Sequence, residues 1–171
     1  MTYQFIKEFE NNYKTIYNEY LTIKNNVYPW PEPELHGGGW DVFGLYLGSE
    51  YDYVTKQTTA QLDMNNCPFT RKLIKDNIPE YGSAGFSILK KNSTIIPHKG
   101  VKNKYLRMHL GLKVPEIGDL GLYVESYGIF QWEESKAFYF DDSKLHRAWN
   151  NTNEDRIVFM IDFDPSTVEL R

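Results

Sequence analysis

The sequence predicts a mainly β protein, a jelly roll (a double-stranded β-helix of the cupin-like type) with N-terminal helices packed on it. Short alternating or apolar runs follow one another over about residues 84–163, and most are separated by turns carrying Asn, Asp, Gly or Pro. An amphipathic segment with helical periodicity precedes them. The length of 171 residues suits one domain. We therefore expect a single domain, 1–171, with a helical and loop-rich part over 1–82 and a jelly-roll core over 83–165.

Composition and charge narrow the classes of function. The chain carries 19 Lys and Arg against 23 Asp and Glu, and 16% of its residues are aromatic. This aromatic content excludes wholesale disorder. Mild acidity gives no support for binding to nucleic acid or to a membrane surface, because both depend on clustered Lys and Arg. The single cysteine, Cys67, excludes an internal disulfide and any multi-cysteine zinc or iron–sulfur site.

No apolar run has the length of a signal-peptide core or of a membrane-spanning helix. We therefore expect a cytoplasmic protein with no membrane span and no nucleic-acid partner.

The chain begins with a predicted helix. Apolar residues recur at steps of three and four from Phe5 to Leu21, and their aromatic stripe is expected to pack against the rest of the domain. Three prolines and three glycines make residues 29–39 a loop. Trp40–Tyr46 is expected to form a short strand.

The next segments are less regular. The polar stretch Ser49–Met64 shows weak alternation at best. Phe69–Ile78 suits a short helix that Pro79 ends and that Asn66 or Thr70 caps.

After Gly82 the pattern changes to short strands, as in a sandwich or barrel. The expected strands are Ala84–Leu89, Tyr105–Val114, Leu120–Val124, Gly128–Trp132, Ala137–Phe140 and Ile157–Phe163.

One of these strands carries an unusual polar face. Arg107 and His109 lie two positions apart, so a strand places them on one face and the neighbouring leucines on the other. Burying an unpaired Arg is prohibitive. That face is therefore either a polar cavity or a solvated sheet face, and these residues alone leave both open.

Three further residues could lie beside the polar face of Arg107 and His109. His98 lies between a proline and a turn, and His146 lies in or after a turn, so each alone is more often a surface residue than a ligand. Arg156 begins the last strand. In a jelly roll, His146 and Arg156 could meet at one cavity mouth. There the His could hold a metal, and the Arg could pair with the far carboxylate of an acid bound to that metal.

Three blocks carry a more specific signal. They read P-H-K-G-V-K-N from Pro97, L-R-M-H-L-G-L from Leu106 and W-E-E-S-K-A-F-Y-F-D-D-S-K-L-H-R-A-W-N-N-T from Trp132, and R-I-V-F-M-I-D follows from Arg156. In order and spacing they resemble the aspartyl/asparaginyl β-hydroxylase family over about residues 84–163.

The resemblance implies a jelly-roll dioxygenase that depends on Fe(II), 2-oxoglutarate and O2. It implies that His98 and His146 are the metal ligands and the catalytic residues. Related oxygenases add a carboxylate two residues after the first His. Here that position is Gly100, as the family resemblance implies, which leaves a more open coordination sphere. Because His ligates in its neutral form, we expect metal binding to weaken below about pH 6.5.

The resemblance also assigns the cosubstrate residues. Arg156 would pair with the distal carboxylate of 2-oxoglutarate, and Ser87 would hydrogen-bond the cosubstrate. Arg107 and His109 would lie at its end nearer the metal. The implied reaction converts 2-oxoglutarate to succinate and CO2 while an unactivated C–H bond is hydroxylated.

Other residues have weaker assignments. Asp141 and Asp142 either orient His146 or form a simple Asx turn, and we favour the turn. His36 could line a substrate entrance, but we expect a solvated loop residue. Trp132 is expected to be a packing residue.

We expect the substrate to be the β-carbon of an aspartyl or asparaginyl residue, or a related small substrate. The partner is then a peptide, a protein or a small amino acid. One alternative is a non-catalytic jelly-roll protein that binds a carboxylate ligand. Another is a hydroxylase of a lipid acyl chain, which we rank lower because the sequence shows no membrane attachment.

Overall fold

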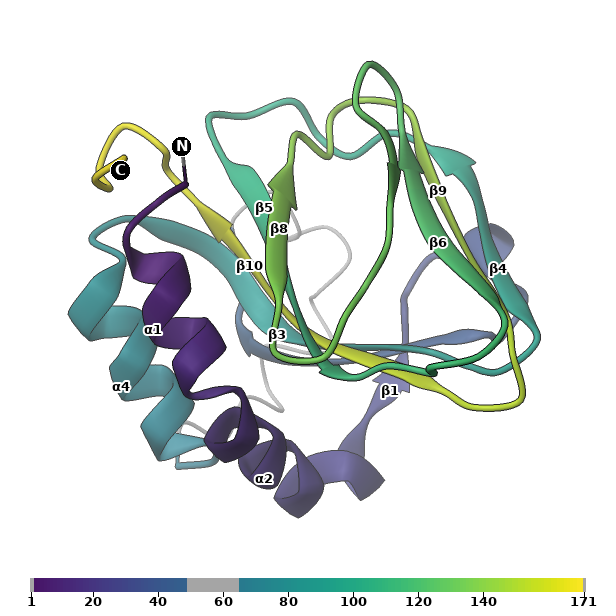
Figure 1. Ribbon diagram of the computed structural model, residues 1–171, viewed down its shortest axis with the longest axis horizontal. Coiled ribbons are helices and arrows are strands. Elements are labelled where there is room, and N and C mark those ends of the chain that lie inside the picture. The colour runs from purple at the N-terminus through teal and green to yellow at the C-terminus, as the bar shows by residue number, and fades with distance from the viewer. Residues whose placement is uncertain (1, 49–64, 171) are drawn as a thin grey trace.

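The computed structural model describes residues 2–48 and 65–170, which form three layers (Figure 1). α-Helices cover one face of a six-stranded sheet, and a four-stranded sheet lies on the other side. The helices are α1 (Phe5–Asn11), α2 (Tyr13–Ile23) and α4 (Pro68–Asn77), with short 3-10 turns at Lys24–Asn26 and Pro33–Leu35. The strands are β1 (Tyr28–Pro29), β2 (Trp40–Tyr46), β3 (Tyr81–Leu89), β4 (Ser93–His98), β5 (Leu106–Lys113), β6 (Asp119–Val124), β7 (Gly128–Phe130), β8 (Ala137–Phe140), β9 (His146–Asn151) and β10 (Arg156–Phe163).

The two sheets confirm the predicted fold class. The larger has the order β1-β2-β3-β10-β5-β8 and the smaller the order β4-β9-β6-β7, with antiparallel neighbours throughout. Two facing antiparallel sheets make a cupin-like jelly roll, and the N-terminal helices pack outside it. The division of the chain at residues 82 and 83 stays a prediction, and the stretch Ser49–Met64 lies outside the described residues.

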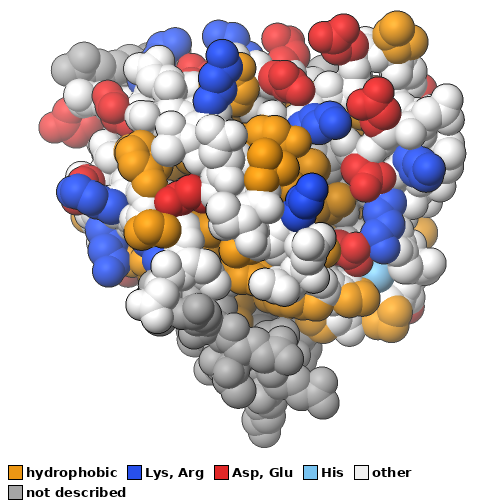
Figure 2. Space-filling model, turned by 90° about the horizontal axis from the view of Figure 1, so that it is seen from below, with side chains coloured by type: hydrophobic (Ala, Val, Ile, Leu, Met, Phe, Trp, Pro, Cys, Tyr) orange, Lys and Arg blue, Asp and Glu red, His pale blue; other side chains and the backbone are white. Residues whose placement is uncertain are grey.

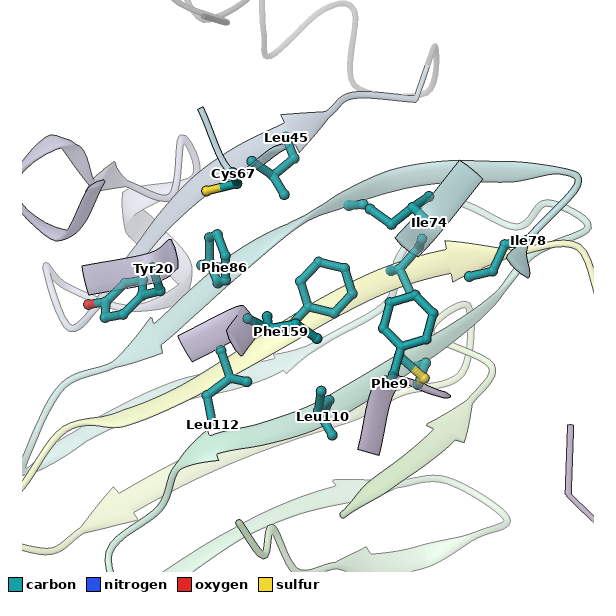
Figure 3. Close-up of a cluster of buried hydrophobic side chains, with 14 of the residues drawn as sticks. Phe9, Tyr20, Leu45, Cys67, Ile74, Ile78, Phe86, Leu110, Leu112 and Phe159 are labelled. Carbon is teal, nitrogen blue, oxygen red and sulfur yellow. The ribbon is translucent and has the colours of Figure 1, made fainter. Parts of the chain in front are cut away.

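The helices pack on the large sheet through a cluster of aromatic and aliphatic side chains (Figure 3). Phe9 of α1 stacks on Phe159 of β10 with ring centroids 5.7 Å apart, and Phe159 in turn contacts Phe86 of β3. All three side chains are fully buried. The aromatic stripe therefore forms the packing face that its spacing predicts.

Two helical details differ from the prediction. The single expected helix is two, α1 and α2, because the side chain of Asn12 donates to the carbonyl of Glu8 and competes with the helical backbone. Neither predicted cap of α4 is used. Instead, Glu19 of α2 accepts hydrogen bonds from the backbone N–H groups of Phe69 and Thr70 at 2.8 Å, and so satisfies donors that a helix start leaves unpaired.

Besides the two-residue β1, which falls at the start of the expected loop, the sequence patterns missed two strands, β4 and β9. Pro97 interrupts the first, and the second is mostly polar, so neither shows clear alternation. β4 tolerates a proline because it lies at the edge of the small sheet. The two strands pair so that His98 and His146 are directly opposite one another.

On the face shown in Figure 2, positive and negative side chains are interspersed and hydrophobic side chains reach the surface between them. Within residues 2–48 and 65–170, no helix is both long enough and apolar enough to cross a bilayer.

Candidate active site

All six predicted site residues line one pocket between the two sheets. The cavity has a volume of about 40 Å³. Its polar residues are Ser87, His98, Arg107, His109, His146 and Arg156. Aromatic and aliphatic side chains make the remaining wall, namely Trp40, Ile95, Leu122, Trp132, Phe140, Ala148 and Met160.

His98 and His146 form a pair across β4 and β9, with ring centroids 4.3 Å apart. Each Nδ1 lies 2.8 Å from a backbone carbonyl oxygen two residues earlier, that of Ile96 or of Lys144. Since a carbonyl oxygen only accepts, each Nδ1 carries the proton and each Nε2 keeps its lone pair. Neither Nε2 is hydrogen-bonded to a described residue, so the two nitrogens are available to a metal ion.

The surroundings of His146 disfavour its protonation. Burial, and after it the nearby His98 and Arg107, lower the pKa of His146 to about 4 although its hydrogen bond to Lys144 acts the other way. Burial acts in this way because it disfavours the charged imidazolium. The expected loss of metal binding below about pH 6.5 stays a prediction.

The position of the missing carboxylate has no room for a side chain. A Cβ on Gly100 would lie 2.5 Å from Oδ2 of Asp142, and the N–H of Gly100 donates to the Asp142 carbonyl at 2.8 Å. Among the residues that the structure describes, no three His, Cys, Asp or Glu side chains are grouped to hold a metal ion. The described pocket therefore offers a metal ion two imidazoles with available Nε2 atoms, those of His98 and His146.

Arg156 is a buried cation that has no anionic partner among residues 2–48 and 65–170. It is 2% exposed, and its Nε and Nη1 lack hydrogen-bond partners. Its Cζ lies 4.5 Å from the ring centroid of Trp132. Burial lowers the pKa of the guanidinium to about 9. An unpaired buried charge is strongly unfavourable, so this position fits an anionic ligand.

Ser87 and His109 present hydrogen-bond donors to the same pocket. Oγ of Ser87 accepts from Nε1 of Trp40 at 2.9 Å, which leaves the hydroxyl proton free to donate. Nδ1 of His109 accepts from Nε1 of Trp132 at 3.2 Å. Burial, reinforced by Arg156 and Arg107, lowers the pKa of His109 well below its usual value. A neutral His109 with an unprotonated Nδ1 carries its proton on Nε2.

Arg107 is buried as well. The face that it shares with His109 is therefore a polar cavity and not a solvated sheet face. The guanidinium of Arg107 contacts Asp162 through Nε and Nη2 at 2.7 and 2.8 Å, and Asp142 through Nη1 at 2.7 Å. Its charge is therefore already balanced within the protein, unlike that of Arg156. A direct contact of Arg107 with a cosubstrate stays a prediction.

The structure settles the weaker assignments. Oδ1 of Asp141 accepts from the N–H and hydroxyl of Ser143, which confirms the Asx turn. Since His146 donates to a carbonyl and Asp142 binds Arg107, neither Asp orients His146. The expectation for His36 is wrong: it is buried, and its ring nitrogens contact the carbonyl of Trp30 and the N–H of Gly38.

Sequence reasoning missed the roles of Asp142, Asp162, Trp40 and Trp132 at the pocket. For Asp162 a signal was present, because it shares the alternation of Arg156 on the last strand and is the only acid of that strand. The contacts of Asp142 and Trp132 depend on a turn and a loop, and that of Trp40 with Ser87 depends on the pairing of β2 with β3, none of which alternation places.

Several known proteins are similar to this chain. The family model described as aspartyl/asparaginyl beta-hydroxylase matches residues 10–165. The ornithine lipid ester-linked acyl 2-hydroxylase of Rhizobium tropici is 38% identical over 105 residues, which cover 61% of this chain and 37% of that protein. The mouse aspartyl/asparaginyl beta-hydroxylase is 29% identical over 164 residues, which cover 93% of this chain and 21% of that protein. The chain thus spans less than half the length of either relative.

A solved structure supports the fold. The prolyl-4-hydroxylase of Pseudomonas putida superposes with a TM-score of 0.57 at 10% sequence identity, covering 91% of this chain and 86% of that one.

Proposed function

Because the chain belongs to the aspartyl/asparaginyl β-hydroxylase family, we propose that it is an Fe(II)- and 2-oxoglutarate-dependent dioxygenase. The observation that supports the cosubstrate best is the buried guanidinium of Arg156, whose Nε and Nη1 have no partner in a pocket that also holds two available imidazoles. Such a cation requires an anion, and a dicarboxylate supplies one.

The polar side chains of the pocket fit both Fe(II) and 2-oxoglutarate. His98 and His146 would hold the iron through Nε2, and neutral imidazoles are ordinary ligands of Fe(II). Arg156 would pair with the distal carboxylate of 2-oxoglutarate, and Ser87 and His109 would donate hydrogen bonds to it. When bound, iron and 2-oxoglutarate supply the oxidation of the substrate C–H bond by O2, with release of succinate and CO2.

The protein's own contribution is selection and orientation. Arg156 lies deep among apolar side chains, where an ion pair is strong because little water screens it. His109 donates as a neutral group, because the charges of Arg156 and Arg107 oppose its protonation. The backbone carbonyls behind His98 and His146 hold both Nε2 atoms unprotonated without adding charge to the site.

For the substrate we propose the β-carbon of an aspartyl or asparaginyl residue, or a related small amino acid. The name of the mouse relative supports this choice. A specific observation favours a lipid acyl chain as the second candidate. A largely apolar pocket lined by Tyr28, Val42 and Leu47 shares Arg107 and Met160 with the site, and the Rhizobium tropici relative is named as an acyl hydroxylase.

The test is turnover of 2-oxoglutarate in aerobic solution with Fe(II), followed by the succinate signals in proton NMR. Three reactions contain an Asp-containing peptide, free Asp or Asn, or an acylated lipid, and a fourth has no substrate. We expect iron-dependent succinate, and a hydroxylated product in one of the first three reactions. His98→Ala and His146→Ala should remove both metal binding and turnover. If the wild-type protein binds no metal and forms no succinate under any condition, the non-catalytic alternative replaces this proposal.

A further inference from the structure

Trp132 connects two of the residues proposed to bind the cosubstrate. It lies between β7 and β8, is 5% exposed and lines the pocket. Its ring lies 4.5 Å from Cζ of Arg156, and its Nε1 donates to Nδ1 of His109 at 3.2 Å. The rings of Trp132 and His109 are nearly parallel, at 15°. One side chain thus contacts both the cation and the neutral donor of the site.

The hydrogen bond from Trp132 determines where His109 carries its proton. An indole N–H can only donate, so Nδ1 of His109 must accept and be unprotonated. Burial and the two neighbouring arginines keep His109 neutral, which leaves the proton on Nε2. The other aromatic rings that contact it are those of Phe138 and Phe140, with centroids 5.7 and 5.2 Å away, and these offer no polar atom; the hydrogen bond from Trp132 is the one that the described residues make to the His109 ring. Within the described residues, Trp132 is therefore the group that fixes this tautomer.

The contact with Arg156 has a second consequence. The guanidinium lies over the ring, so a cation–π contact offsets part of the cost of an unpaired buried charge. Nε and Nη1 of Arg156 have no hydrogen-bond partner in the part of the chain that the structure describes. Trp132 thus stabilises the guanidinium of Arg156 through its face, and Nε and Nη1 of the guanidinium stay available to a ligand.

We propose that Trp132 is a positioning residue for the dicarboxylate cosubstrate. It holds His109 as the Nε2–H tautomer and supports the guanidinium of Arg156, so that both residues present donors before the ligand arrives. This inference rests on the proposed function for the identity of the ligand, but the tautomer of His109 is a property of the free protein.

Trp132→Phe is the direct test, because it keeps an aromatic ring beneath Arg156 and removes the N–H, and the smaller ring that it introduces is matched in the control. The chain offers a matched control in Trp149→Phe. Nε1 of Trp149 donates to Asp119 at 2.6 Å, and its ring lies 4.9 Å from Cζ of Arg147. It therefore has the same two kinds of contact, but it is not among the pocket residues.

The first measurement is long-range proton–nitrogen NMR of the histidine rings in the metal-free, full-length protein. With four histidines in the chain, His109→Gln identifies the signals of His109 by their loss. We expect wild type and Trp149→Phe to show His109 protonated on Nε2 alone. In Trp132→Phe we expect the Nδ1 signal to move toward that of a protonated nitrogen. A wild-type His109 protonated on Nδ1 would overturn the inference without reference to any variant.

The second measurement is calorimetric binding of 2-oxoglutarate to protein loaded with Mn(II) in place of iron. Losing one ordinary hydrogen bond lowers the affinity for a ligand by up to about tenfold. We expect a decrease of that size in the affinity for 2-oxoglutarate in Trp132→Phe and none in Trp149→Phe. The inference fails if Trp132→Phe matches Trp149→Phe in both the tautomer and the affinity. If wild type does not bind 2-oxoglutarate, the proposed function fails instead, and the NMR result still decides the role of Trp132.

Discussion

Replacing Arg156 by Met should make the ligand-free protein more stable and at the same time remove its response to 2-oxoglutarate. In the ligand-free pocket Arg156 is 2% exposed, and two of its nitrogens are unpaired. A methionine has an apolar side chain of similar reach and no charge to bury. A residue kept at a cost in stability is expected where a ligand supplies the missing partner.

The magnitude follows from the burial of the guanidinium. A pKa of about 9 in place of 12.5 for Arg156 disfavours its charged form by about 5 kcal/mol. The cation–π contact with Trp132 offsets about 2 kcal/mol of this. We therefore expect Arg156→Met to raise the free energy of unfolding by about 3 kcal/mol, within the range of about 1–4 kcal/mol seen when buried ionic groups are replaced by apolar ones.

The assay is urea unfolding of metal-free wild type and Arg156→Met, repeated with Mn(II) and saturating 2-oxoglutarate. At a hundred times its dissociation constant a ligand adds about 2.7 kcal/mol to the free energy of unfolding, and we expect that gain for wild type only. Arg147→Met serves as the control, because Arg147 also lies over a tryptophan ring but is exposed. A variant that is less stable than wild type, or that is still stabilised by 2-oxoglutarate, would refute the reasoning.

Three further outcomes are expected. The pKa of His146 is lowered to about 4 by burial. Between pH 6.5 and 4 the unfolded chain therefore binds a proton that the native state does not, and the metal-free protein should lose about 3 kcal/mol of stability as the pH falls through that window. Urea midpoints measured across this range should show the loss, and His146→Gln should reduce it; equal slopes in both proteins would contradict this. Gly100→Asp should lower stability without tightening Mn(II) binding, because a Cβ there would lie 2.5 Å from Oδ2 of Asp142. Calorimetry that found tighter metal binding would count against it. Glu19→Ala should lower stability by about 1–2 kcal/mol, since α4 loses its cap, and iron-dependent turnover should stay at the wild-type level. A decrease in turnover of the folded variant would show that Glu19 acts on the pocket.

The sequence predicted the fold class because every strand of the large sheet except the two-residue β1 has a clear pattern. β2 and β8 have the predicted bounds, and the alternation that separates Arg107 and His109 from the leucines is seen in β5. The edge strand β4 and the polar strand β9 have no such pattern, and both carry site residues. Their histidines were identified from the family resemblance and not from periodicity.

The site was predictable as a set of residues but not as a set of interactions. The six candidates do line one pocket. Two arginines on neighbouring strands nevertheless differ in charge balance. Asp142 and Asp162 contact Arg107, whereas no carboxylate of the described residues contacts Arg156, which lies over the ring of Trp132. That difference arises from a turn and from strand register, which residue types and spacing do not encode. The hydrogen bonds that fix the histidine tautomers depend on the same long-range arrangement.

The most direct test of the central claim is a crystal structure with Fe(II) and 2-oxoglutarate, grown without oxygen and with iron located by anomalous scattering. The account predicts iron bound to Nε2 of both His98 and His146, with the distal carboxylate of 2-oxoglutarate paired to Arg156. Iron bound elsewhere, or a cosubstrate carboxylate that leaves Nε and Nη1 of Arg156 unpaired, would contradict it.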